Sequence, residues 1–331
     1  MSQEITKVLE YALEQGASDA IIVEGSAPSL RLGGRVGKMT DAPEIPVGSI
    51  DSFLGDSPEI SGSKVVTISG TKWRMRFSRA ARGKTAVFRP LLGECPDFDS
   101  LGVPDAVRGL MLPISGLVLF CGPATCGKTT VASAFVSAYA RSQVRRVLFL
   151  DRASEYEIPL GESLVMRPEA ATEPQVAVSH ALRAGVDLVW FGDLARESVL
   201  PALRAAEAGA LVVATVTAGT VAGALAWLLD SAPGNELVKT LLASTLRAAV
   251  LEHLLPANDG SMVPAWEVAF GNQNVSLAIR SGDLHKIVQC IQSGANEGML
   301  PLDSSLAELV GSGYVSKAEA SKIAYDVSRL G

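Results

Sequence analysis

A glycine-rich segment in the middle of the chain constrains the fold more than any other feature. Residues 122–129 read GPATCGKT and satisfy the pattern G-x-x-x-x-G-K-[ST] at every fixed position. An apolar run at 116–120 precedes this segment, and a predicted helix at 131–139 follows it. Strand, loop and helix in this order predict an α/β fold with the loop at the carboxyl end of a buried strand.

The residue types in the loop suit the binding of phosphates. Glycines let the backbone pass close to an anion with its N–H groups turned inward. The Lys128 ammonium would face the β- and γ-phosphates, the Thr129 hydroxyl would ligate Mg²⁺, and the following helix would aim its N-terminus at the same anion. We therefore expect ATP and Mg²⁺ to bind here, with the nucleotide held by Gly122, Pro123, Ala124, Thr125, Cys126, Gly127, Lys128, Thr129 and Thr130.

Apolar segments alternate with helical ones through the second part of the chain. Strands are predicted at 116–120, 146–150, 187–191 and 211–216, and helices at 131–139, 175–184 and 200–208. This alternation predicts a parallel sheet covered by helices on both faces. Beyond Asn235 the pattern predicts a mostly helical region that closes with a helix at 317–330.

The first part of the chain has a different pattern. Ile5, Val8, Leu9 and Leu13 recur at helical spacing, and several short strands follow, two of them joined by a hairpin turn at 33–34. Strands so close together require antiparallel pairing. The sequence thus predicts a small α+β domain at 1–95, a linker at 96–108 rich in proline and glycine, and a second domain at 109–331.

Composition limits the classes of partner that the chain could bind and the cellular compartment in which it could act. The net charge is −6, from 29 basic and 35 acidic residues, which argues against a nucleic-acid partner. No two of the four cysteines have C-x-x-C spacing, so we expect neither a zinc site nor disulfides, and a reducing cytoplasm fits best. The uncharged stretch 208–229 is long enough to span a bilayer, but its turn residues favour a buried strand followed by a helix.

Carboxylates follow two of the predicted strands. Asp193 comes after the strand at 187–191, while Asp151 and Glu155 follow the strand that ends at Leu150. Because the carboxyl ends of parallel strands share an edge with the loop, we expect Asp193 and Thr129 to hold Mg²⁺, with Asp151 or Glu155 positioning metal and water. Two simpler alternatives remain: Asp193 as the N-cap of the next helix, and Glu155 as a solvated loop acid.

Arginines are concentrated in the first domain. They could form an ordinary basic surface, or they could be supplied to the nucleotide of a neighbouring subunit, where they would stabilise transferring charge. The residues concerned are Arg74, Arg76, Arg79, Arg82 and Arg89.

Beyond these local patterns, the chain resembles the PilT-type retraction ATPases of type IV pili, within the wider secretion ATPases, along its whole length. The segments that carry the resemblance are 15–19, 31–36, 82–89, 116–129, 206–215, 291–294 and 302–306. Arg82 and Arg89 match the family's trans-acting arginines directly, and either Arg74 or Arg76 matches a third. Arg280 falls on an arginine of the family's retraction signature, the rest of which is poorly kept.

The resemblance implies a fold, an assembly and a role. The fold would be a PAS-like N-terminal domain followed by a RecA-like P-loop ATPase domain with a helical C-terminal region. The assembly would be a homohexamer with ATP at the subunit boundaries. It would dock on the cytoplasmic side of the pilus inner-membrane platform protein, retract the pilus and drive twitching motility.

The chain also departs from this family. The family's Walker B strand ends in Gly-Glu, whereas this chain has Gly192-Asp193. Asp151-Arg152 stands where the family has Glu-Asp. Ala210 and Thr217 replace both histidines of the family's His box. A misplaced carboxylate can cost about a hundredfold in rate. Two functions therefore stay open: an active motor, and a hydrolysis-impaired accessory subunit that works with an active paralogue. A small-molecule P-loop kinase is disfavoured, since no arginine-rich lid follows the core.

Overall fold

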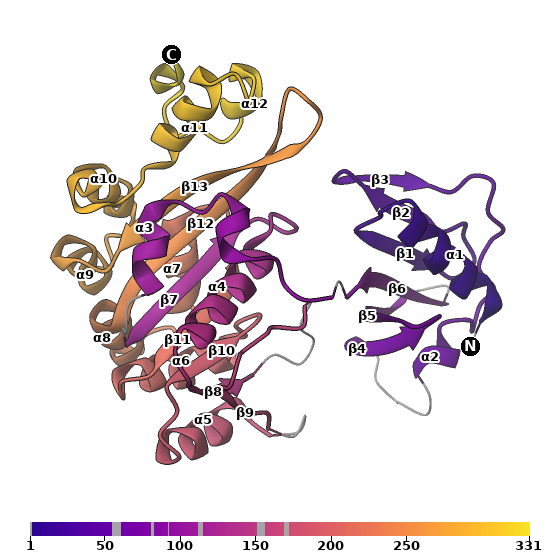
Figure 1. Ribbon diagram of the computed structural model, residues 1–331, viewed down its shortest axis with the longest axis horizontal. Helices are drawn as coiled ribbons and strands as arrows, with labels where there is room; N and C mark the ends of the chain where they lie inside the picture. Colours follow the sequence, from indigo (N-terminus) through magenta and orange to yellow (C-terminus); the bar gives the residue numbers. More distant parts are fainter. Residues whose placement is uncertain are drawn as a thin grey trace. The chain divides into compact units, whose positions relative to one another are not determined.

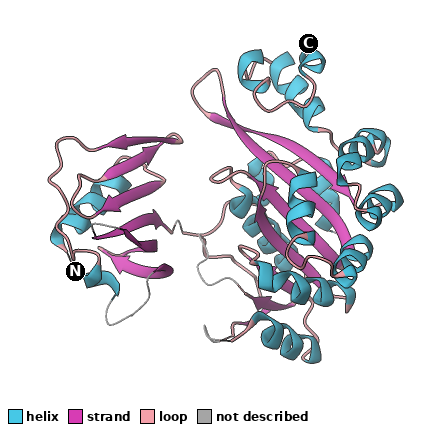
Figure 2. Ribbon diagram, turned by 180° about the vertical axis from the view of Figure 1, so that it is seen from behind, coloured by secondary structure: helices cyan, strands magenta, loops and turns pink. Residues whose placement is uncertain are grey.

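The computed structural model describes residues 2–54, 61–80, 83–91, 93–111, 115–150, 156–168 and 172–331. The chain forms two compact units, which are taken one at a time. The first ends at Glu94 and also includes residues 156–157, and the second holds the other described residues from Cys95 onward. Each unit is built around its own β-sheet (Figures 1 and 2).

The first unit contains a six-stranded sheet in the order β3-β2-β1-β6-β5-β4, and every neighbouring pair is antiparallel, as the close spacing predicted. Its elements are α1 (Gln3–Glu14), β1 (Asp19–Val23), β2 (Ser29–Leu32), β3 (Arg35–Lys38), α2 (Asp51–Leu54), β4 (Ser61–Ile68), β5 (Thr71–Ala80) and β6 (Gly83–Pro90). The predicted hairpin turn joins β2 to β3. Gly33 and Gly34 both have positive φ there, +53° and +78°.

Helix α1 packs on the first sheet through one face. Ile5, Val8 and Leu9 are buried as expected, but the fourth inward position is Ala12, whereas Leu13 is 38% exposed. The prediction for Leu13 was wrong because positions 5, 8, 9 and 12 follow the i, i+3, i+4, i+7 stripe, from which residue 13 has rotated away. The small Ala12 brings the helix close to the sheet.

The second unit contains a seven-stranded sheet in the order β13-β12-β7-β11-β10-β8-β9. All neighbouring strands are parallel except β12 and β13. Its strands are β7 (Gly116–Gly122), β8 (Arg146–Phe149), β9 (Leu164–Met166), β10 (Leu188–Phe191), β11 (Leu211–Thr217), β12 (Leu246–Pro256) and β13 (Met262–Phe270).

Helices cover both faces of this second sheet (Figure 2), as the alternation predicted. On one face, α4 (Lys128–Ser142) buries Phe135 against Phe120 of β7. On the other face, α6 (Val199–Glu207), α7 (Val221–Leu229) and α8 (Glu236–Thr245) share a core with Leu117 and Leu119. The remaining α-helices are α3 (Asp105–Arg108), α5 (Pro174–Arg183), α9 (Gln273–Ser281), α10 (Ile287–Ser293), α11 (Leu302–Gly311) and α12 (Lys317–Ala320).

Two further segments bear on the sequence expectations. Residues 96–108, predicted as a linker, contain a 3₁₀ helix (Phe98–Leu101) and α3, and their Phe98 and Val107 are buried in the core beneath α4. The uncharged stretch 208–229 is β11 followed by α7, which confirms the strand-then-helix interpretation. Within the described ranges, no helix combines the length and the hydrophobicity that crossing a bilayer would require.

The region after Asn235 differs from the sequence prediction. It contains the long antiparallel pair β12–β13 as well as helices, and residues 317–330 form only the short α12 and a terminal 3₁₀ turn (Val327–Leu330). The Ala- and Leu-rich run 246–255 is typical of a helix by composition. Pairing with β7 on one side and β13 on the other overrides that local preference, because a central strand satisfies its backbone on both edges.

Candidate nucleotide-binding site

The loop between β7 and α4 has the backbone of an anion-binding turn. Thr125 and Gly127 both adopt left-handed conformations, with φ of +65° and +101°. Gly127 is the N-cap of α4, and its carbonyl accepts the Val131 N–H at 3.0 Å. Left-handed residues placed within a turn curl the chain so that successive N–H groups converge. The backbone therefore has the shape of a phosphate loop at the predicted residues, and the binding of phosphate by these residues stays a prediction.

Two glycines in the loop are required by the residues packed beneath the loop, in addition to any requirement set by a ligand. A Cβ on Gly122 would meet both the Cys126 sulfur and the carbonyl oxygen of Glu252. A Cβ on Gly127 would lie 2.7 Å from Oε1 of Glu252. Real Cβ atoms do not approach so closely, so the floor of the loop excludes any side chain at these positions.

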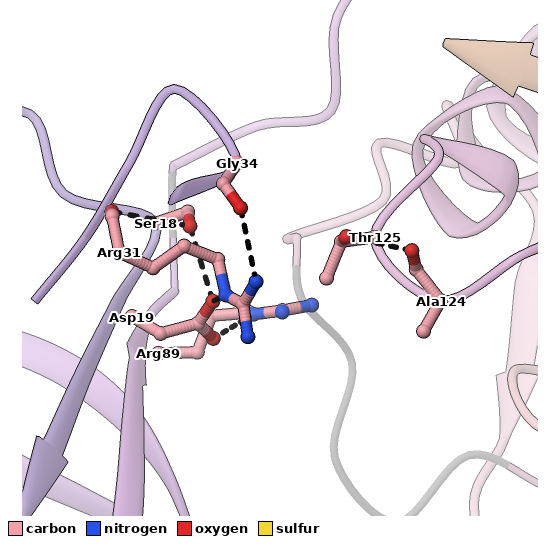
Figure 3. Close-up of polar contacts among 7 residues, drawn as sticks. All are labelled: Ser18, Asp19, Arg31, Gly34, Arg89, Ala124 and Thr125. Carbon is pink, nitrogen blue, oxygen red and sulfur yellow. Dashed lines mark hydrogen bonds and ion pairs between the residues drawn. The ribbon is translucent and has the colours of Figure 1, made fainter. Parts of the chain in front are cut away.

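The charges around the loop favour an anion. The Lys128 ammonium donates to the Pro123 carbonyl at 3.1 Å, and the Thr125 hydroxyl donates to the Ala124 carbonyl at 2.6 Å (Figure 3). The first turn of α4 carries no acidic residue, so no side chain of this fifteen-residue helix offsets its positive end. Lys128, the turn amides and the helix end together provide the positive potential that a phosphate needs.

The cysteine within the loop is packed underneath it. Cys126 is buried, and burial is the main cause that raises the pKa of its thiol above the ordinary value. A thiol held in its neutral form is a poor nucleophile. These observations favour the interpretation of Cys126 as a small filler residue.

Asp193 lies at the same edge of the sheet as the phosphate loop. It follows β10, and β10, β11 and β7 are consecutive parallel strands whose carboxyl ends share that edge. Ala195 and Ser198 hold the N-cap positions of the next two helical segments, so the alternative that Asp193 is an N-cap is wrong. Asp151 and Glu155, the other two predicted carboxylates, lie outside the described residues.

The backbone on both sides of Asp193 is fixed by one residue of β11. The buried Thr215 hydroxyl donates to the Gly192 carbonyl, and the Leu194 N–H donates to the Thr215 carbonyl at 3.0 Å. Neither contact involves the Asp193 side chain. The residues on either side of the carboxylate are therefore both tied to β11.

The two positions that lack the family's histidines lie at opposite ends of β11. Thr217 pairs in register with Gly122, the first residue of the phosphate loop, and the next amide, Ala218 N–H, donates to the Gly122 carbonyl at 3.1 Å. Ala210 immediately precedes the strand and is 2% exposed. At roughly 3.3 Å per residue, the strand separates the two positions by about 23 Å. Only residue 217 borders the loop.

The predicted arginines of the first unit include members of an ion-pair network. Arg89 on β6 and Arg31 on β2 contact opposite oxygens of the Asp19 carboxylate, at 2.8 and 3.0 Å from their Nε atoms, and the Ser18 hydroxyl donates to Asp19 at 3.0 Å (Figure 3). Asp19 is 3% exposed. Arg74, buried on β5, is the register partner of Arg89. Arg82 lies outside the described residues.

A family model described as "Type II/IV secretion system protein" matches residues 64–293, more than two thirds of the chain. This protein belongs to that family of secretion ATPases. The match includes the phosphate loop, Asp193 and the substituted positions of β11.

Within this family, the secretion ATPase is similar to characterised proteins along nearly its whole length. It is 25% identical to the type IV pilus retraction ATPase PilT of Pseudomonas aeruginosa, over 96% of this chain and 97% of that one. It is also 25% identical to the type IV pilus ATPase PilU of the same organism, over 96% and 87%. A crystal structure of the retraction motor PilT with bound ADP superposes with a TM-score of 0.78, at 25% identity and covering 99% of both chains.

The secretion ATPase's own residues fit a magnesium–nucleotide complex by their chemistry. The Thr129 hydroxyl and the Asp193 carboxylate are hard oxygen donors of the kind that Mg²⁺ prefers, and a Mg²⁺ ion usually takes only one or two protein ligands beside phosphate oxygens and water. Across the described ranges, no group of three His, Cys, Asp or Glu side chains is arranged to hold a metal by itself.

Sequence reasoning missed one residue at this site. Glu252 on β12 is 5% exposed, lies beneath Gly127, and has a carboxylate oxygen, Oε2, without a hydrogen-bond partner. Burial raises the pKa of this carboxyl to about 8, while the nearby Lys128 charge lowers it. The signal that could have revealed it is an acidic residue, next to His253, within the largely apolar segment 248–255. Its meaning depends on a register that the sequence does not show.

Proposed function

We propose that this family member is an ATP-binding and ATP-hydrolysing motor of a type IV pilus or a related secretion system. It would act as a homohexamer on the cytoplasmic side of the inner-membrane platform protein, retract the pilus and so drive twitching motility. The observation that carries this proposal is the complete phosphate loop, formed on a chain that is similar to PilT from end to end.

Each residue in the proposed site has a distinct task. Lys128 and the loop amides hold the phosphates, and Thr129 and Asp193 hold Mg²⁺, which supplies positive charge against the phosphate oxygens when bound. Asp193, with Asp151 or Glu155, positions the attacking water. Arg82 and Arg89 of a neighbouring subunit complete the charge, with Arg74 or Arg76 as a third.

The test of this proposal is steady-state ATP turnover by the purified full chain. Lys128→Ala removes the ammonium beside the phosphates and should reduce turnover to background. Lys239→Ala is the matched control, because Lys239 is a surface residue of α8 paired with Glu236 at 2.9 Å; it should turn over ATP like the wild type. Equal turnover by wild type and Lys128→Ala would contradict the motor.

A second function is an accessory subunit that binds ATP, hydrolyses it poorly and works beside an active paralogue. The substitutions at this edge of the sheet favour it, since Asp193 has the shorter acid and Thr217 stands beside Gly122 where the family has histidine. Tight ATP binding with turnover near background, rising when an active paralogue is added, would support the accessory subunit over the motor.

A further inference from the structure

We propose that Glu252 is a positioning residue of the phosphate loop: its neutral carboxyl supports the loop from beneath, and its ionisation weakens the hold on the nucleotide's phosphates. This inference rests on the proposed function, since it concerns regulation of the same site by pH.

The strand register brings Glu252 under the loop. Leu251 of β12 pairs with Cys121 at the end of β7, so the next residue along β12 lies where the loop begins. Side chains alternate along a strand, and Val250 faces the α4 side of the sheet, so Glu252 faces that side too. This placement brings the Glu252 carboxyl against Gly127. Its Oε1 and Oε2 atoms lie 2.7 Å and 3.1 Å from the position that a Cβ on Gly127 would take.

The Glu252 carboxyl is buried beneath the phosphate loop. It is 5% exposed, and Oε2 is buried without a hydrogen-bond partner. Burying a charged carboxylate costs far more than burying a neutral carboxyl, so the proton is retained near neutral pH. The same burial raises the pKa of Glu252 to about 8, which places its ionisation within the range that a binding experiment can cover.

The charged and titratable groups around Glu252 determine which interactions its ionisation would change. On the same side of the sheet, the loop contributes Cys126 and α4 contributes Lys128, and both interact electrostatically with it. Its register partner on β13 is Trp266, which does not titrate. The other titratable groups nearby alternate to the opposite face: Cys121, His253 and Glu267.

Ionisation of Glu252 would lower the affinity for the nucleotide in two ways. A negative charge beneath the loop repels the phosphates, and it attracts the Lys128 ammonium that would otherwise serve them. A unit charge in a partly buried site changes affinity by about tenfold. Affinity for the nucleotide should therefore fall as pH rises through about 8.

The experiment is isothermal titration calorimetry of the full chain with ADP and Mg²⁺ from pH 7 to pH 9.5. Wild type should lose about tenfold in affinity across this range. Glu252→Gln keeps the shape of the side chain and cannot ionise, so it should bind like wild type at pH 7 and stay flat. Glu267→Gln, a buried carboxyl on the opposite face, should keep the wild-type slope.

A second readout does not depend on a variant. If phosphate binding favours the protonated carboxyl, wild type near pH 8 must take up a fraction of a proton for each ADP bound, which calorimetry in buffers of different ionisation enthalpy measures. Flat wild-type binding with no proton uptake, or a slope unchanged in Glu252→Gln, would overturn this inference and leave nucleotide binding intact. Absence of ADP binding at every pH would overturn the proposed function as well.

Discussion

The phosphate loop and the ends of strands β10 and β11 share one edge of a sheet, but they keep the family's pattern to different degrees. The loop has every fixed residue and the left-handed turns that the motif needs. Asp193, after β10, and Thr217, at the end of β11, stand where the resemblance places larger residues. In the proposed function, holding the nucleotide and hydrolysing it depend on separate segments, so one can change without the other.

The two segments also differ in how they are supported. The loop rests on side chains, because Gly122 and Gly127 pack against Cys126 and Glu252. At Asp193, the Thr215 hydroxyl donates to the Gly192 carbonyl, and the Leu194 N–H donates to the Thr215 carbonyl. Changes of side-chain volume under the loop should therefore disturb binding and folding, whereas a change of the acid after β10 should act mainly on turnover.

The largest effect is expected from Gly127→Ala. A Cβ would meet the Glu252 carboxylate, and φ of +101° is strained for any other residue, so nucleotide affinity should fall at least a hundredfold and stability by about 2–4 kcal/mol. Gly260→Ala is the control, since Gly260 has φ of +85° with nothing within 4 Å of its Cβ position. Calorimetry and denaturant unfolding would measure both. Equal losses in the two variants would show that the packing beneath the loop is unimportant.

Asp193→Glu tests the other segment. Restoring the longer acid at this position should raise ATP turnover by about tenfold and leave ADP affinity unchanged within about twofold. Asp193→Asn keeps the length and removes the charge, so it should lower turnover. If Asp193→Glu changed affinity but not rate, the separation between the segments would be wrong.

The two substituted positions of β11 should respond unequally. Thr217→His places an imidazole beside Gly122 and should raise turnover a few-fold, with the largest gain in combination with Asp193→Glu. Ala210→His forces a ring into a buried site at the far end of the strand, so it should cost about 1–3 kcal/mol and leave turnover per folded molecule unchanged. A gain from Ala210→His would refute the assignment of these ends.

The smallest effect concerns Glu267 on β13, which is 1% exposed and accepts a hydrogen bond from the Tyr325 hydroxyl at 3.1 Å. Burial raises its pKa from 4.5 to about 7. The native state then binds more protons than the unfolded chain, so stability falls as pH rises from about 4.5 to 7 and levels off above. Thermal unfolding at pH 5 and pH 8 should show a smaller loss for Glu267→Gln than for wild type. An identical loss would mean that Glu267 ionises normally.

Sequence reasoning reached the parts of the molecule that depend on local patterns. The strand–loop–helix at 116–142 was predictable because the motif specifies its own flanks. The antiparallel first sheet followed from strand spacing and the turn at Gly33-Gly34. The assignment of catalytic and metal-binding roles, and the domain limits at 95 and 109, remain predictions.

The parts that were missed depend on long-range pairing. Residues 246–255 look helical by composition, and only their register between β7 and β13 makes them a strand. Glu252 gained its place from the same register, since its neighbour in space is 125 residues away at Gly127. Such a long-range contact cannot be predicted from the local patterns of a single sequence.

The contacts of Thr215 tie Gly192 and Leu194, the residues on either side of Asp193, to the neighbouring strand. If the chain hydrolyses ATP as proposed, exchange of the acid at this one position would change the rate while the strands beside it keep their register.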